Sequence, residues 1–173
     1  LGCAYEGGEV WARPELFASS VSMGAPPDPF ARDGQVWNLP PFNPLELARR
    51  DHVPFAEILR ANMRHAGVLR IDHVLGLARQ FWVPRGASGG AGAYVAMPVN
   101  RLMSVVAAES LKAECAVIGE DLGTVPEGFR ERIWSANMLS YRVLWFEQDE
   151  QAYAPPEAYP RQAAVCLSSH DLL

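Results

Sequence analysis

The stretch Val68-Leu69-Arg70-Ile71-Asp72-His73 decides the fold class, because a short apolar run leads directly into a carboxylate and an imidazole. The same change of character occurs at residues 116–121 (AVIGED) and 163–171 (AAVCLSSHD), and a further apolar run lies at residues 141–146 (YRVLWF). Short apolar runs of this kind are typical of buried strands. The sequence therefore predicts four strands, three of which end in acidic residues.

Helical patterns alternate with these strands. Residues 43–46 (NPLE) combine an N-cap, a proline at the first helical position and a glutamate at the third. Helices are also expected over residues 54–66, over residues 100–113 with Asn100 as cap, and over residues 124–134 with Thr124 and Glu127 as a capping box. This alternation predicts an α/β fold with a parallel sheet.

The arrangement of polar residues favours a barrel. In a (β/α)₈ barrel the carboxyl ends of the strands supply the active site. A doubly wound sheet is less favoured, since no Gly-rich phosphate loop follows a strand. Four strands are fewer than a closed barrel has, so we expect residues 1–173 to be a single fragment of a TIM barrel domain. Residues 44–173 would form its β/α units and residues 1–43, rich in Gly and Pro, a long irregular loop.

Composition excludes several classes of function. The chain is 49% hydrophobic and 20% charged, as in an ordinary globular protein. A net charge of −5 and a single lysine give no basic surface for nucleic acid or for an anionic membrane. No apolar stretch has membrane-spanning length. Cys3, Cys115 and Cys166 are too far apart for a metal motif, and we expect them to be thiols of a cytoplasmic protein.

Asp72 and Glu120 are candidates for the two carboxyl groups that glycoside chemistry requires. One carboxylate attacks or stabilises the anomeric carbon, and a second, protonated carboxyl group gives a proton to the leaving oxygen. Arg70 lies two residues before Asp72, so both side chains face the same side of a strand and the guanidinium would keep Asp72 ionised. Glu120 needs a raised pKa, which desolvation or the charges of Asp72, Asp121 and Asp171 would supply.

The residues alone leave alternatives open. Asp72 could be an ordinary strand-end carboxylate paired with Arg70. Asp121 could cap the helix that follows it, because a helix N-terminus favours anions. His73 and His170 could be metal ligands, although no ligand-spaced cluster accompanies them, and a hydrogen-bonding role is favoured.

The order of several motifs resembles that of the amylomaltase family, the 4-α-glucanotransferases of glycoside hydrolase family 77. The resemblance covers nearly the whole chain, from Val10 to the last residues. The motifs of the substrate loop are GAPPDPF at 24–30, GQVW at 34–37 and PP at 40–41, and the catalytic motifs are RIDH at 70–73, GEDLG at 119–123 and SHD at 169–171.

The resemblance implies that Asp72 is the nucleophile, Glu120 the general acid/base and Asp171 a third acid that holds sugar hydroxyls. The four strands would match the fourth to seventh strands of the barrel. Members of the family retain the anomeric configuration by double displacement, for which the two carboxyl groups lie about 5–5.5 Å apart. The family needs no metal or organic cofactor.

The loop also suits a sugar, because aromatic rings pack on the C–H faces of the ring while amides and carboxylates bind its hydroxyls. The residues expected to bind substrate are Arg70, His73, His170, Asp28, Phe30, Gln35, Trp37 and Asp121.

The expected function is the transfer of α-1,4-glucan segments from a donor glucan to an acceptor sugar. An α-amylase-like hydrolase that uses the same acids is one alternative, and the substrate loop favours transfer over it. A piece that binds glucan without turnover is another, because the chain lacks an initiator methionine and ends just past a catalytic motif. Open sheet edges would favour self-association.

Overall fold

A computed structural model describes residues 2–29, 31–149 and 152–169. The chain forms two compact units. Unit 1 comprises Leu1–Ile58 and Gly76–Val105, and unit 2 comprises Leu59–Leu75 and Val106–Leu173. The division therefore does not follow the expected boundary at residue 43.

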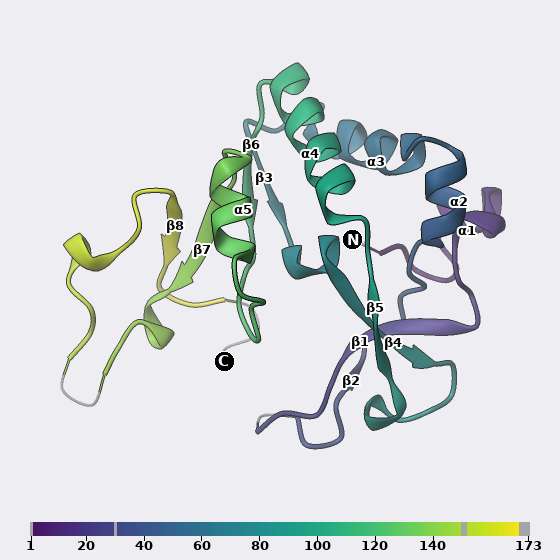
Figure 1. Ribbon diagram of the computed structural model, residues 1–173, viewed down its shortest axis with the longest axis horizontal. Helices are drawn as coiled ribbons and strands as arrows, with labels where there is room; N and C mark the ends of the chain where they lie inside the picture. The colour runs from purple at the N-terminus through teal and green to yellow at the C-terminus, as the bar shows by residue number, and fades with distance from the viewer. Residues whose placement is uncertain (1, 30, 150–151, 170–173) are drawn as a thin grey trace. The chain divides into compact units, whose positions relative to one another are not determined.

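Unit 2 contains a four-stranded parallel sheet in the order β3-β6-β7-β8 (Figure 1). Its strands are β3 (Val68–Ile71), β6 (Ala116–Gly119), β7 (Leu139–Val143) and β8 (Ala163–Cys166). Because all four strands run in the same direction, their carboxyl ends lie at one edge of the sheet. The predicted parallel sheet, and with it part of an α/β barrel, is confirmed.

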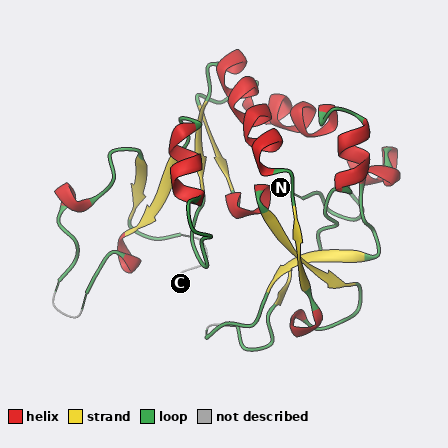
Figure 2. Ribbon diagram, viewed as in Figure 1, coloured by secondary structure: helices red, strands yellow, loops and turns green. Residues whose placement is uncertain are grey.

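Helices precede or follow these strands as the alternation predicted. α3 (Val53–Met63) leads into β3, α4 (Val99–Ala113) leads into β6, and α5 (Phe129–Ser135) packs against β7. In its described residues, the connection from β7 to β8 has only the short turns η4 (Leu144–Phe146) and η5 (Pro156–Ala158), as Figure 2 shows. That connection therefore departs from a regular β/α unit.

Several expected boundaries were wrong, among them the end of the helix expected over residues 54–66, which is α3 and ends at Met63. α4 begins at Val99, so Asn100 lies inside the helix. β7 runs from 139 to 143, and the remainder of the expected strand is η4. α5 begins only at Phe129, with Gly128 as N-cap at φ 72°, so Thr124 and Glu127 do not occupy the N-cap and N3 positions of this helix. Pro126 keeps Val125 out of a helix, because a proline restricts the preceding residue to extended conformations, and the left-handed Gly128 places the start at Phe129.

Unit 1 contains an antiparallel sheet in the order β2-β1-β4-β5. The expectation that residues 1–43 are irregular was wrong in part, because this region contributes two of the four strands and two short helices. The elements of the unit are α1 (Gly8–Ala12), η1 (Pro14–Leu16), β1 (Val21–Ala25), β2 (Gln35–Val36), α2 (Pro44–Arg49), η2 (Val74–Leu77, which crosses the boundary), β4 (Arg79–Pro84), η3 (Gly89–Ala91) and β5 (Ala93–Ala96).

β1 is a strand because of a partner that lies far away in sequence. It pairs with β4 from Val21↔Pro84 to Gly24↔Phe81, and with β2 on its other side. Gly24 is required there, since a Cβ at this position would lie 2.0 Å from the carbonyl oxygen of Gln35. The beginning of α2 follows the sequence rule, because the Asn43 side chain accepts a hydrogen bond from Leu45 N. Within the described ranges, no helix is both long and apolar enough to cross a membrane.

Candidate active site

Asp72 and Glu120 occupy equivalent places on neighbouring strands. β3 pairs with β6 in a register that ends at Ile71↔Gly119, and each acid is the next residue along its strand. The two backbones remain hydrogen-bonded at these residues: Glu120 N donates to Ile71 O and Val74 N donates to Glu120 O, both at 2.9 Å. The expectation that parallel strands bring these two acids to one edge is confirmed.

The Glu120 carboxyl group is held by two backbone N–H groups. His73 N donates to Oε2 at 2.7 Å, and Leu122 N donates to Oε1 at 2.8 Å. Glu120 is only 9% exposed. His73 itself adopts a left-handed conformation with φ 46°. The site therefore orients Glu120 through main-chain N–H groups of the residues that follow β3 and β6.

The pKa of Glu120 is raised above its usual value. Burial is the largest cause, and the negative charge of Asp72 adds to it. The hydrogen bonds from Leu122 and His73 and the charge of Arg70 act in the opposite direction but do not outweigh burial. The predicted direction is confirmed, and a carboxyl group that keeps its proton is what general acid catalysis requires.

Asp72 is accessible, in contrast to Glu120. Its side chain is 63% exposed, and its Oδ1 accepts a hydrogen bond from Arg70 Nη1. The Arg70 guanidinium carbon lies 4.8 Å from the centre of the Tyr141 ring on β7. Arg70 Nε and Nη2 are buried and have no hydrogen-bond partner among the residues that the structure describes. An exposed carboxylate oriented by a stacked arginine is well placed to meet a ligand.

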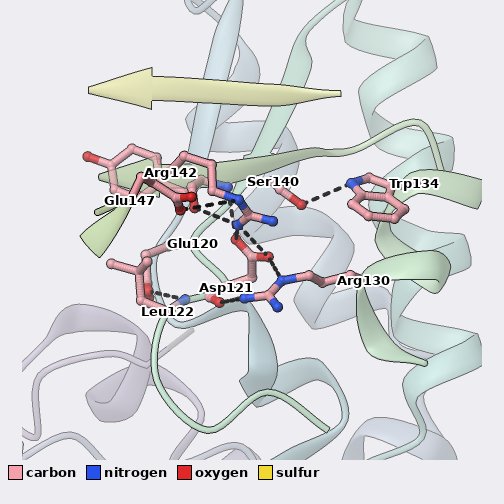
Figure 3. Close-up of polar contacts among 9 residues, drawn as sticks. Glu120, Asp121, Leu122, Arg130, Trp134, Ser140, Arg142 and Glu147 are labelled. Atoms are coloured by element: carbon pink, nitrogen blue, oxygen red, sulfur yellow. Dashed lines mark hydrogen bonds and ion pairs between the residues drawn. The ribbon is translucent and has the colours of Figure 1, made fainter. Parts of the chain in front are cut away.

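Asp121 requires a correction, because the sequence placed it among the substrate-binding residues. Its side chain is 0% exposed, and both carboxylate oxygens are occupied. Tyr141 N donates to Oδ1 at 2.8 Å, and Arg130 Nε donates to Oδ2 at 2.8 Å (Figure 3). Arg142 Nη1 lies within 3.3 Å of the same carboxylate. Asp121 also caps no helix N-terminus, since α5 begins eight residues later, at Phe129.

The substrate-loop residues lie in unit 1. Asp28 is exposed, and its Oδ1 accepts from Ala31 N at 2.6 Å. Gln35 Oε1 accepts from Trp37 Nε1 at 2.9 Å, which leaves the half-buried indole ring fixed beside the amide. Asp28 thus lies in the connection between β1 and β2, Gln35 in β2, and Trp37 directly after it.

Three other predicted site residues, Phe30, His170 and Asp171, lie outside the described residues. The sequence also missed residues that support the site: Arg130, Tyr141 and Arg142. Arg142 is buried in the middle of an apolar strand, and a charge at such a position was the available signal. Tyr141 and Arg130 carry no comparable signal, because the sheet order brings Tyr141 to Arg70, and the packing of α5 on β7 brings Arg130 to Asp121.

The loop at residues 26–34 is anchored by a contact between two glycines. Gly34 adopts φ 70°, and a Cβ on it would lie 2.9 Å from the carbonyl carbon of Gly89. A Cβ on Gly89 would in turn lie 2.5 Å from the carbonyl carbon of Gly34 and 2.7 Å from Asp33 O. All of these neighbours are backbone atoms, which cannot rotate away as a side chain would.

Gly89→Ala is therefore expected to release this loop. Overpacking typically costs about 1–3 kcal/mol, so local opening should increase about tenfold or more. The measurement is the rate of tryptic cleavage after the exposed Arg32 in the folded protein. Gly90→Ala is a matched control, because its Cβ would meet only Pro27 Cγ at 3.8 Å. Equal cleavage rates in the two variants would contradict the anchoring role of this contact.

The fold and the site together define a class of protein. Carboxyl groups at the carboxyl ends of adjacent parallel strands, one exposed and one buried with a raised pKa, are the arrangement of barrel enzymes that act on glycosides.

The comparison with known proteins gives the family. Residues 1–173 match the family model described as 4-alpha-glucanotransferase, and the chain belongs to this family. It is 46% identical to a 4-alpha-glucanotransferase of Haemophilus influenzae, over 95% of this chain and 24% of that protein. It is 40% identical to one of Mycobacterium tuberculosis, over 99% and 24% respectively. The chain thus spans about a quarter of the length of these curated relatives.

Two solved amylomaltase structures have a fold similar to that of this chain. The crystal structure of amylomaltase from Corynebacterium glutamicum superposes with a TM-score of 0.92 at 35% identity, covering 99% of this chain and 25% of that one. The amylomaltase from Streptococcus agalactiae in complex with acarbose gives a TM-score of 0.87 at 21% identity, which supports the fold alone.

Proposed function

We propose that this chain carries the catalytic acids of a 4-α-glucanotransferase that moves α-1,4-glucan segments to an acceptor sugar. The observation that supports it best is the pair of Asp72 and Glu120 at register-matched ends of β3 and β6. Burial raises the pKa of Glu120, while Asp72 is exposed beside Arg70. Family membership adds the reaction class.

The proposed reaction is a double displacement with retention. In the first step a carboxylate oxygen of Asp72 bonds to the anomeric carbon, the glycosidic bond breaks, and the Glu120 proton passes to the leaving oxygen. In the second step Glu120, now ionised, takes the proton of an acceptor hydroxyl. That oxygen attacks the anomeric carbon and displaces Asp72. Asp171 is proposed as the third acid, which holds sugar hydroxyls during both steps.

The remaining proposed substrate contacts come from two sets of residues. Arg70, His73 and His170 would act beside the catalytic acids, and Asp28, Phe30, Gln35 and Trp37 would act from the loop. Asp121 is left out of this set because its carboxylate is fully buried and bonded.

A cytoplasmic location stays part of the proposal, on the interpretation of Cys3, Cys115 and Cys166 as thiols. All three are free in the structure.

Transfer and hydrolysis can be separated by counting reducing ends. The full-length protein is incubated with maltotriose, and the products are resolved by length. Transfer breaks one glycosidic bond for each bond that it forms, so longer oligosaccharides appear with no increase in total reducing ends. A rise in reducing ends without longer products would indicate a hydrolase. If neither the number of reducing ends nor the lengths of the oligosaccharides change, the proposed function is overturned.

The pH dependence follows from the raised pKa of Glu120. Glu120 must be protonated in the free enzyme, so kcat/KM should fall on the alkaline side as pH rises through its pKa. Because that pKa lies above the usual value of about 4.3, the fall should come at a higher pH than for an ordinary glutamate. The measurement is the pH profile of kcat/KM with maltotriose. An alkaline limb at or below about pH 4.3 would contradict the burial argument.

A further inference from the structure

Asp121 is the centre of a buried ion-pair cluster that connects the end of β6 to β7 and α5 (Figure 3). It follows Glu120 at the end of β6, and its partners are Arg142 on β7 and Arg130 on α5. Glu147 Oε1 lies 3.6 Å from Arg142 Nε at the edge of the cluster. Burial by itself would raise the pKa of Asp121, but the bonds from Tyr141 and Arg130 and the charge of Arg142 lower it. Asp121 is therefore held as a carboxylate.

The Asp121 carboxylate accepts a hydrogen bond from the β7 backbone in place of a backbone carbonyl of β6. The β6–β7 ladder ends at Gly119↔Ser140. Beyond it, Tyr141 N donates to Asp121 Oδ1 at 2.8 Å instead of to a backbone carbonyl. β6 can thus leave the sheet at Glu120 without an unpaired N–H on β7, and Glu120 can turn toward β3.

Asp121 and Arg130 are connected to Glu120 through one peptide group, the one that joins Asp121 to Leu122. Arg130 donates twice to Asp121, from Nε to Oδ2 at 2.8 Å and from Nη2 to the main-chain oxygen at 3.4 Å. That carbonyl and Leu122 N–H belong to the same peptide unit, which is planar and trans. Fixing the direction of the carbonyl therefore fixes the direction of the N–H, which donates to Glu120 Oε1 at 2.8 Å.

We propose that Asp121, clamped by Arg130, is a positioning residue for the acid/base carboxyl group of Glu120. It acts by holding the peptide group whose N–H orients Glu120 Oε1, and it does not contact the sugar. This inference rests on the proposed function, because it assigns Asp121 to the proton-transfer step of that reaction. Loss of the clamp should impair proton delivery to the leaving oxygen and leave substrate binding intact.

The test compares two substrates in the full-length protein that differ in their need for an acid. Cleavage of maltotriose needs a proton on the departing oxygen. α-Maltosyl fluoride does not, because fluoride leaves as the anion while Asp72 bonds to the anomeric carbon. In Asp121→Asn the side-chain NH₂ group must face either the Arg130 or the Tyr141 donor, and the negative charge that holds Arg130 is lost in both cases, so the clamp is weakened. We expect kcat for maltotriose to fall about 10²-fold with KM nearly unchanged, as for a catalytic group displaced by about 1 Å.

Fluoride release in the first turnover of the same variant should stay near that of the unaltered protein. If Asp121→Asn does not fold, Arg130→Met carries the test, because Arg130 is a half-exposed side chain and its loss leaves Asp121 paired with Arg142. In Arg130→Met, kcat for maltotriose should also fall while fluoride release stays near that of the unaltered protein, and the fall should be smaller than in Asp121→Asn.

Ser140→Ala is the matched control. Ser140 is also buried, and its Oγ accepts from Trp134 Nε1 at 3.0 Å in the same region (Figure 3), but this side-chain bond, which the substitution removes, does not involve the Asp121–Leu122 peptide group or Glu120. Ser140→Ala should leave the ratio of the activities on maltotriose and α-maltosyl fluoride unchanged. Equal losses on both substrates in Asp121→Asn, or no loss on maltotriose, would overturn the positioning role. Failure of the unaltered protein to turn over either substrate would instead overturn the proposed function.

Discussion

Asp72→Asn in the full-length protein is expected to lower kcat for glucan transfer about 10⁴-fold or more, as removal of a nucleophile does in other covalent catalysts. An amide has the shape of the carboxylate but cannot form the glycosyl ester. The measurement is the rate of oligosaccharide formation from maltotriose. With α-maltosyl fluoride, the variant should also give no glycosylated protein by mass spectrometry.

The stability of this variant serves as its control. Asp72 is 63% exposed and Arg70 28%, so the pair is only partly buried, and an asparagine oxygen can still accept the hydrogen bond from Arg70 Nη1. The melting temperature should therefore change little, and a loss of activity is then a loss of chemistry. Activity within about tenfold of the unaltered protein would show that Asp72 is not the nucleophile.

Glu120→Gln should have the second largest effect, a loss of about 10²–10⁴-fold in kcat for maltotriose. Both oxygens of Glu120 accept backbone N–H bonds, from His73 and Leu122. A glutamine would retain one of these bonds, turn its NH₂ group toward the other donor, and have no proton to give. The loss should be specific for substrates that need an acid.

The same variant distinguishes the acid from the base role. α-Maltosyl fluoride needs no acid in the first step, so glycosylation of Asp72 should proceed. The second step needs a base to deprotonate the acceptor, so the glycosyl-enzyme should accumulate and be visible as a mass increase of one maltosyl group. If Glu120→Gln turns over maltotriose at a near-normal rate, the acid/base assignment is wrong.

The parallel sheet was readable from local sequence because its signals are local. Each strand is a short apolar run, and each acid follows its strand directly, as in Ile71-Asp72 and Gly119-Glu120. In a parallel sheet, equivalent positions on neighbouring strands meet at one edge, so strand order and direction were enough to bring Asp72 and Glu120 together.

The antiparallel sheet of unit 1 was not readable in the same way. β1 is five residues long and contains a glycine, and β2 has only two residues. β1 pairs with β4, about sixty residues further along the chain, where Val21 pairs with Pro84, and β2 in turn pairs with β1. Strand propensity depends strongly on such partners, and they are not adjacent in sequence.

The sequence by itself determined the α/β class, the family resemblance, and the identity and pairing of the two candidate catalytic acids. Only the tertiary structure decided what each acidic residue does. Glu120 and Asp121 are adjacent carboxylates with the same local signal. Their surroundings differ: among the described residues, Glu120 has two backbone donors and no cation bonded to it, which leaves burial to raise its pKa. Asp121 meets Arg130 and Arg142, which come from α5 and β7. The electrostatic environment of a carboxyl group is set by neighbours from distant parts of the chain, and these are fixed only by packing.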